Sequence, residues 1–410
     1  MRDQREALSA LKWCAGHSEK RGVHCNHMQS VVEGLVLERG LPESIETEEE
    51  AVAALLRDCA CYESGTGNSN VTPYMPSRLS LPTDITGAPL LDSVVLAGPA
   101  FFLQGDYTHM LKGERELLEL ADHGPDLRPY MDVHLRRDAA QYEVFVKRLL
   151  ELGIFQLTLR PAEEAACFFV KKKLNQQRLV IDCRRPNLRF RSAPGVSLAT
   201  PEALAAVECT APSGLWLAEA DVDNCFHRIR IKESLGRYFA MPPLSAAALG
   251  VCSVSGTLVE SSDSVWPCLA VAPMGWTWSL YFAQSINCDH VSDAVRPFSA
   301  QAVNAELPAV HLDGVDRRLA FFVYVDNVGI LGTNPKEVEE ALKATTESLD
   351  ATGLLCKTDG RAHRELDILG VDFNNDVGGA SAPQPSAIGG CVGCCDGCSD
   401  GLVSRGGSSR

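Results

Sequence analysis

Residues 215–226, LWLAEADVDNCF, and residues 319–331, LAFFVYVDNVGIL, are the two stretches that decide the fold. Each contains an apolar run typical of a buried β-strand, and a carboxylate stands near its end, Asp221 in the first and Asp326 in the second. Two strands that end in this way can bring both carboxylates to one rim of a sheet. Two carboxylates at close range repel each other, and a divalent cation with oxygen ligands, most often Mg²⁺, relieves that repulsion and also binds phosphates.

The bulk composition is that of an ordinary globular protein. The 410 residues are 45% hydrophobic and 22% charged, which is enough to form a full core in two or three domains. No apolar run approaches the roughly 18 residues of a membrane span, and the start, MRDQREALSA, lacks the apolar core of a secretory signal. We therefore expect an intracellular protein with no membrane partner and with reduced cysteines, in either the nucleus or the cytoplasm.

The charge is unevenly distributed along the chain. The net charge of −15 argues against a general nucleic-acid binder. Residues 171–191, KKKLNQQRLVIDCRRPNLRFR, nevertheless hold eight Lys or Arg against the single acidic residue Asp182. A solvated basic face is one interpretation of this segment. The motifs described below supply the other, which is a site for polyphosphate.

Three regions differ in texture. Residues 1–129 form a weakly patterned region of unknown function, with helices expected at 46–64 and 111–123. Residues 130–375 carry strands and helices with long, unequal connections, which predicts an α+β domain. Residues 376–410 are rich in Gly, Ser and Cys, and we expect this tail to be disordered.

Within the middle region, hydrophobic periodicity separates helices from strands. Amphipathic or uniformly apolar stretches with Gly or Pro at their ends predict helices, and short apolar runs predict strands. Helices are expected at 138–153, 277–295 and 336–353, and strands at 168–170, 179–181, 215–222 and 319–325.

Five motifs follow one another in this region. They are RLVIDCRRPN at 178–187, DVDNCF at 221–226, APMGWTWS at 272–279, YVDN at 324–327, and the pair GLLCK at 353–357 with ILGVDF at 368–373. An ordered series of this kind is far more specific than any one motif alone.

In this order the motifs resemble the fingers and palm of a reverse transcriptase, the RNA-directed DNA polymerase of retroelements. The resemblance runs from about Tyr130 to Phe373, somewhat over half of the chain. It implies a right-hand polymerase fold, in which a ferredoxin-like palm sheet carries helices on one face. The resemblance stops after Phe373, so the thumb is expected to be absent or truncated.

The basic segment and the first acidic motif resemble the nucleotide site of that family. The resemblance implies that Lys172, with Lys171 or Lys173 as alternatives, and Arg178 hold the triphosphate of an incoming dNTP, as cationic donors can. Asp221 would be the first metal ligand and the Val222 carbonyl a further one.

Two residues beside Asp221 invite different interpretations. The resemblance places Phe226 where an aromatic ring closes over the sugar and excludes a 2′-hydroxyl, and plain core packing is the alternative. Asp223 occupies a position that is usually not a ligand, so we interpret it as a surface or structural acid.

The later motifs supply the remaining roles. Met274 and Gly275 would contact the nucleotide, because Gly275 permits a close backbone approach. Tyr324 would contact the primer and template, and Asp326 would be the second principal metal ligand. Asn327 departs from the family, whose motif has Asp there, so this position keeps an oxygen donor but loses a charge.

The last motifs concern proton transfer and the primer end. Lys357 would donate a proton to departing pyrophosphate, and a solvated lysine is the alternative interpretation. Leu369 and Gly370 would form the hairpin that holds the primer.

Two functions follow from the resemblance. The first is template-directed DNA synthesis by two-metal phosphoryl transfer, with Mg²⁺ or Mn²⁺ as cofactor and with an RNA or DNA template, a primer and dNTPs as partners. The second is a decayed or co-opted palm that binds nucleic acid without polymerising, which Asn327 and the missing thumb favour. The sequence does not identify protein partners.

Overall fold

The computed structural model of the chain describes residues 71–123, 127–369 and 371–374. The helix expected at 46–64, the primer-hairpin residue Gly370 and the tail 376–410 lie outside these residues. Within the described part, the chain mixes helices with several small sheets and so belongs to the α+β class. Among the described residues, no helix combines the length and apolar character needed to cross a membrane.

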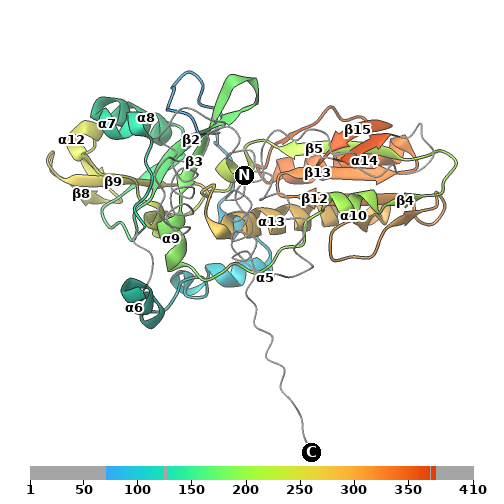
Figure 1. Cartoon of the computed structure of the whole chain (residues 1–410), viewed down its shortest axis with the longest axis horizontal. Coiled ribbons are helices and arrows are strands. Elements are labelled where there is room, and N and C mark those ends of the chain that lie inside the picture. The colour runs from blue at the N-terminus through green and yellow to red at the C-terminus, as the bar shows by residue number, and fades with distance from the viewer. Residues whose placement is uncertain (1–70, 124–126, 370, 375–410) are drawn as a thin grey trace, which may run out of the picture. The chain divides into compact units, whose positions relative to one another are not determined.

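The two acidic segments lie side by side in one sheet (Figure 1). Its five described strands are β5 (Trp216–Val222), β10 (Gln301–Ala302), β12 (Leu319–Tyr324), β13 (Asn327–Gly332) and β14 (Cys356–Lys357). Their order across the sheet is β10-β12-β13-β5-β14. β12 and β13 form an antiparallel hairpin, β13 and β14 each pair antiparallel with β5, and β10 runs parallel to β12.

One face of this sheet packs against the two long helices α13 (Thr277–Val295) and α14 (Pro335–Ala351). Side chains alternate between the faces of a strand, and Ala218, Ala220 and Val222 of β5 join the core on the helical side. α13 contacts β12, whereas α14 contacts β5 and β13.

The other face is covered as well. Leu217, Phe322 and Leu331 point away from the long helices into a second core, where Leu204 and Ile368 meet them. The covering elements are α10 (Pro201–Ala205), β4 (Glu208–Cys209), β11 (His311–Leu312), β15 (Glu365–Ile368) and β16 (Val371–Asn374). The expectation that helices cover one face of the sheet therefore holds for the long helices α13 and α14, whereas the short helix α10 covers the other face. β12 and β13 carry apolar residues on both faces, so both faces must be covered there.

A separate hairpin carries the basic segment. It consists of β2 (Ala166–Lys172) and β3 (Gln176–Asp182), joined by the short turn η4 (Lys173–Asn175). Phe169 of β2 packs edge-on against Phe145 of α8 (Ala139–Glu151), with ring centroids 5.9 Å apart. The hairpin thereby has its own aromatic core.

Described residues before the expected boundary at residues 129–130 also pair with the β2–β3 hairpin. The described residues from Val71 onward belong to the same compact unit as the sheet. The reason is backbone pairing, because Val71 bridges Val170 of β2 and Leu79 bridges Gln177 of β3. The early segment thus extends the β2–β3 hairpin on both edges.

The remaining described elements are short. The helices are α4 (Leu91–Val94), α5 (Ala97–Ala100), η2 (Phe101–Leu103), η3 (Gly105–Tyr107), α6 (Glu114–His123), α7 (Val133–Arg137), α9 (Arg184–Arg189), η5 (Cys225–Arg228), α11 (Glu233–Gly236), η6 (Arg237–Phe239), α12 (Ala246–Leu249) and η7 (Arg296–Phe298), and the strands are β1 (Phe155–Thr158), β6 (Leu244–Ser245), β7 (Ser253–Val254), β8 (Thr257–Leu258) and β9 (Ser264–Leu269).

Candidate active site

Asp221 and Asp326 meet at the same end of the central sheet. Asp221 is the residue directly opposite Asn327 in the β5–β13 pair, and Asp326 immediately precedes Asn327 in the chain. The N–H of Val222 donates a hydrogen bond to the Asp326 carbonyl oxygen at 2.8 Å. The backbone of the two acidic segments is therefore joined at the point where the carboxylates stand.

The pKa values of both carboxyl groups, Asp221 and Asp326, are raised. Asp221 is exposed, yet the surrounding protein partly desolvates its carboxyl group. This desolvation, followed by the charge of Asp326, raises the pKa of Asp221 to about 6. Burial also raises the pKa of Asp326, with Arg178 acting in the opposite direction. A bound cation would relieve both effects.

Asn327 contacts one of these acids. Its side-chain amide donates a hydrogen bond to Asp326 Oδ1 at 3.3 Å. The residue is half-buried at the start of β13. The position predicted to carry a weakened ligand is thus occupied by an amide beside the acidic pair.

Lys357 lies beside Asp221 on the other side of β5. The two residues are paired in the β14–β5 register. The Lys357 ammonium forms an ion pair with Asp223, whose carboxylate and carbonyl also contact the buried guanidinium of Arg228, at 3.5 Å and 2.9 Å. Burial would raise the pKa of Asp223, but the hydrogen bond and charge of Lys357 lower it below its usual value.

The basic hairpin contributes cations to the same region. Val170 pairs with Arg178 and Lys172 with Gln176, so Lys172 and Arg178 share one face of the hairpin. Burial lowers the pKa of Lys172, the positive charges of Arg178 and Lys357 lower it further, and Asp223 and Asp221 oppose them. The charges of the hairpin therefore interact with those of the acidic rim, the end of the sheet that carries Asp221 and Asp326.

Because side chains alternate between the faces of a strand, Lys171 and Lys172 lie on opposite faces of the hairpin. Lys171 is exposed and its side chain lies on the face opposite Lys172. The Lys172 ammonium donates a hydrogen bond to Ser80 Oγ at 2.9 Å. The Lys173 side chain lies outside the described part of the structure.

Phe226 and His227 occupy the turn that follows Asp221. Phe226 is half-buried against the larger core. Burial, followed by the charges of Lys172 and Arg178, lowers the pKa of His227 to about 4. The turn after β5 therefore lies within electrostatic reach of the basic hairpin. No sequence motif had indicated a role for His227.

The segment with Met274 and Gly275 is fixed to the basic hairpin. The N–H of Ile181 in β3 donates to the Met274 carbonyl at 3.1 Å. Gly275 has φ +121°, and a Cβ there would lie 2.4 Å from the Ile181 carbonyl oxygen. The side chain of Asn187 donates to the Gly275 carbonyl at 3.0 Å and accepts from the Thr277 N–H at 3.2 Å. Gly275 is therefore required for packing against β3.

The predicted primer contacts lie at two turns. Tyr324 ends β12, opposite Asn327, and is 36% exposed. Leu369 lies at the β15–β16 turn with φ 51° and packs half-buried against the second core. The geometry brings Tyr324 beside the acidic pair and gives Leu369 a packing role.

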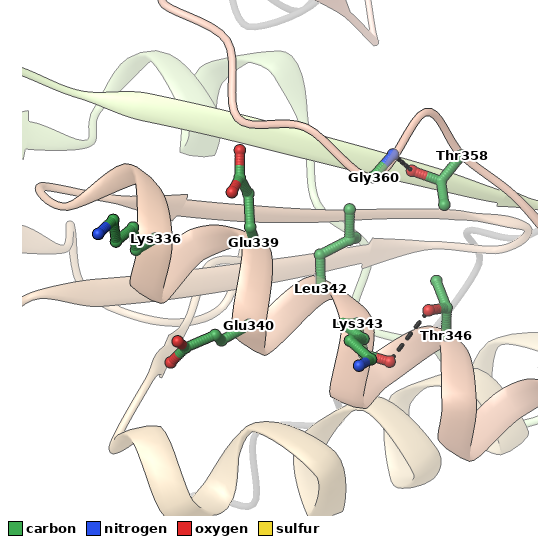
Figure 2. A pocket seen from close by; sticks show the side chains of 8 residues that line it. All are labelled: Lys336, Glu339, Glu340, Leu342, Lys343, Thr346, Thr358 and Gly360. Atoms are coloured by element: carbon green, nitrogen blue, oxygen red, sulfur yellow. Dashed lines mark hydrogen bonds between the residues drawn. The ribbon is translucent and has the colours of Figure 1, made fainter.

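A pocket of about 430 Å³ lies elsewhere on the surface (Figure 2). α14 and the loop after β14 line it, and none of the site residues predicted from the sequence is among its lining residues, which are Lys336, Glu339, Glu340, Leu342, Lys343, Thr346, Thr358 and Gly360. Figure 2 shows side chains of both charges around it, so it offers no concentrated charge of one sign.

The acidic rim fits a cation that brings part of its own coordination shell. Within the described ranges, no group of three or more His, Cys, Asp or Glu could hold a metal. Mg²⁺, however, is usually bound by one or two carboxylates together with waters and substrate phosphates. Asp221 and Asp326 supply such a pair, and the predicted Val222 carbonyl and the Asn327 amide are further oxygen donors.

No protein-family model matches the chain, and no curated protein matches it significantly.

Proposed function

We propose that the chain is a template-directed DNA polymerase of the reverse transcriptase type, derived from a retroelement. The observation that carries the proposal is the convergence of Asp221 and Asp326 at one sheet rim, within charge range of Lys172 and Arg178. Carboxylates bind the cations that accompany a nucleotide, and Lys and Arg bind its phosphates. Phosphoryl transfer needs little beyond such positioning and charge stabilisation.

The proposed roles follow from this arrangement. The central sheet acts as the palm and the β2–β3 hairpin as part of the fingers. Asp221, Asp326 and the Val222 carbonyl would hold Mg²⁺ or Mn²⁺, which when bound activates the primer 3′-hydroxyl and stabilises leaving pyrophosphate. Lys172 and Arg178 bind and orient the triphosphate.

The other residues act on the substrates. Lys357, beside Asp221 in the sheet, donates a proton to the leaving group. Phe226 limits the space at the sugar, and Tyr324 contacts the primer and template. Met274 and Gly275 form the wall of the nucleotide site, and Leu369 with Gly370 supports the primer.

A second candidate function is nucleic-acid binding without synthesis. Asn327 removes one charge from the rim, and Lys357 is engaged by Asp223. Both features weaken catalysis more than binding, since the cations of the hairpin are retained.

The test is primer extension by the full-length protein, with RNA and DNA templates and with Mg²⁺ or Mn²⁺. We expect extension by the wild type and its loss in Asp221→Asn. The control is Asp293→Asn, which removes an exposed carboxylate near the end of α13 and should leave extension unchanged. Fluorescence anisotropy with a labelled primer–template measures binding separately. Binding without extension would favour the second function, and absence of both would exclude both.

A further inference from the structure

The turn that carries Asp326 has a strained backbone. Val325 lies between β12 and β13 with φ 56°, in the left-handed region that a β-branched residue rarely adopts. The residue is buried, at 7% exposure. A conformation of this kind persists only where the surrounding structure holds it.

Two buried side-chain amides of α13 hold this turn. Gln284 accepts a hydrogen bond from the Val325 N–H at 2.7 Å, and Asn287 donates one to the Val325 carbonyl at 2.5 Å. Both polar groups of the strained residue are therefore satisfied by side chains that lie three positions apart on one helix. Gln284 and Asn287 are only 3% and 0% exposed.

The same amides extend to neighbouring segments. The Gln284 amide nitrogen donates to the Val323 carbonyl at 3.1 Å, which fixes the end of β12. The Asn287 amide nitrogen lies 3.8 Å from the sulfur of Cys225, in the turn that follows Asp221. α13, which contacts β12 (Figure 1), thus reaches both acidic segments.

An amide suits this place because it is neutral and carries both a donor and an acceptor. A charged side chain would add a buried charge next to two carboxylates that already repel each other. An apolar side chain would leave the N–H and carbonyl of Val325 buried without these partners.

We infer that Gln284 and Asn287, the amide pair, are positioning residues that set the backbone of the Val325 turn and thereby the Asp326 carboxylate for cation binding, an inference that rests on the proposed function. They touch no reacting atom. Their effect on a bound cation passes through the turn, as for groups that orient metal ligands in other proteins.

The experiment measures Mn²⁺ affinity of the full-length protein by electron paramagnetic resonance of free Mn²⁺, without nucleic acid. Gln284→Met keeps the volume but removes the hydrogen bonds, and we expect Mn²⁺ binding to weaken by about tenfold, the lower end of the range for groups that orient metal ligands. Circular dichroism checks the fold. If this variant does not fold, Asn287→Ser, a smaller change, takes its place with the same expected loss.

The matched control is Thr345→Val on α14. Thr345 is fully buried, and its hydroxyl bonds the Ala341 carbonyl of its own helix, away from the turn. This variant should leave Mn²⁺ affinity unchanged. Equal losses in Thr345→Val and Gln284→Met would reduce the amide pair to ordinary core structure.

Val325→Gly separates positioning from general destabilisation. Glycine adopts a positive φ without strain, so the turn should need the amide pair less. In the Val325→Gly background, Gln284→Met should weaken Mn²⁺ binding by less than about threefold, compared with about tenfold in the wild-type background. Equal losses in both backgrounds would overturn the inference.

The outcomes also separate this inference from the proposed function. A wild type that binds Mn²⁺ through Asp221 but extends no primer would contradict polymerase activity while leaving the positioning role supported by the affinity data. A wild type whose Mn²⁺ affinity equals that of Asp221→Asn would overturn both, because no cation would then bind at the rim.

Discussion

Asp221 lies directly opposite Asn327 across the β5–β13 pair, so the two side chains occupy the same face of the sheet. An acid at position 327 would place a third negative charge beside Asp221 and Asp326. Asn327 avoids this repulsion and donates a hydrogen bond to Asp326 instead. The amide therefore spares the fold a third negative charge at this end of the sheet.

Gly275→Ala should destabilise the protein by more than backbone strain alone. The added Cβ would meet the Ile181 carbonyl oxygen at 2.4 Å, and the φ of +121° is nearly closed to other residues. We expect a loss of about 3 kcal/mol or more in the free energy of unfolding, measured by urea denaturation, because strain of about 1–3 kcal/mol is joined by a clash.

Gly256→Ala is the matched control for this prediction. Gly256 also has a positive φ, +81°, but a Cβ there meets nothing within 4 Å. It should lose about 1 kcal/mol, which is the strain alone. Similar losses in the two variants would show that β3 gives way at Gly275.

His227 should make stability depend on pH in the weakly acidic range. Burial and nearby cations lower the pKa of the folded-state imidazole from 6.5 to about 4, so the folded protein resists protonation there. The stability associated with neutral His227 is complete above about pH 6.5 and is lost as the pH falls towards 4. The loss has an upper limit of about 3 kcal/mol, since the ring is only half-buried and water screens part of the effect.

The measurement is urea denaturation of the wild type and His227→Gln at intervals between pH 7 and pH 4. The wild type should lose more unfolding free energy than the variant across this range. Parallel curves would mean that His227 titrates alike in the folded and unfolded chains.

Under the proposed function, Phe226→Ala should relax sugar selection. The half-buried ring follows Asp221 and packs against the core, so its removal opens space beside the acidic rim. We expect dNTP incorporation to continue and NTP incorporation to rise by at least about tenfold, since each 1.4 kcal/mol of lost discrimination is a factor of ten. Single-nucleotide extension with dNTP and NTP substrates measures the ratio.

Phe298→Ala is the control for this ring. Phe298 is also half-buried against the same core but lies in η7, after α13. It should cost stability without changing the ratio of NTP to dNTP use. A change of equal size in both variants would leave Phe226 as ordinary core.

The sequence predicted the regular elements well where the hydrophobic period was clear. The helix expected at 277–295 is α13 with the same bounds, and the strands expected at 215–222 and 319–325 are β5 and β12 within one residue at each end. These predictions are confirmed because each segment is long and its apolar pattern is sustained. The two strands that carry Asp221 and precede Asp326 could therefore be predicted from the sequence alone.

The contacts between distant segments were beyond such a pattern. Val71 and Leu79 form isolated bridges with the β2–β3 hairpin, but they lie in a stretch rich in Gly, Pro and Ser whose pattern does not predict this pairing. The second core opposite the long helices depends on Leu217 and Phe322, and the apolar residues on either side of each of them hide the face to which each belongs. Likewise, the bonds of Gln284 and Asn287 to Val325 follow from a packing that sequence spacing does not encode.

Asn327→Asp should increase the use of Mg²⁺. The added carboxylate would supply a charge that the rim lacks, and hard cations bind charged oxygen more tightly than amide oxygen. For the wild type we expect slow extension with Mg²⁺ and faster extension with Mn²⁺, because Mg²⁺ demands near-ideal octahedral geometry and carboxylate and carbonyl oxygens also suit Mn²⁺. A lost carboxylate contact corresponds to about 2–4 kcal/mol of transition-state stabilisation, by analogy with the loss of one preorganised electrostatic group.

Asn327→Asp should also destabilise the fold when no cation is bound. The new carboxylate would face Asp221 and adjoin Asp326, so repulsion should lower the free energy of unfolding at neutral pH, and added Mg²⁺ should restore it by binding the folded state. The test is a metal titration of both proteins in the same primer-extension assay, together with thermal unfolding with and without Mg²⁺. Equal Mg²⁺ dependence in both assays would show that position 327 contributes nothing to cation binding. Mg²⁺-dependent stabilisation without extension in either protein would favour a rim that binds cations and nucleic acid but no longer catalyses synthesis.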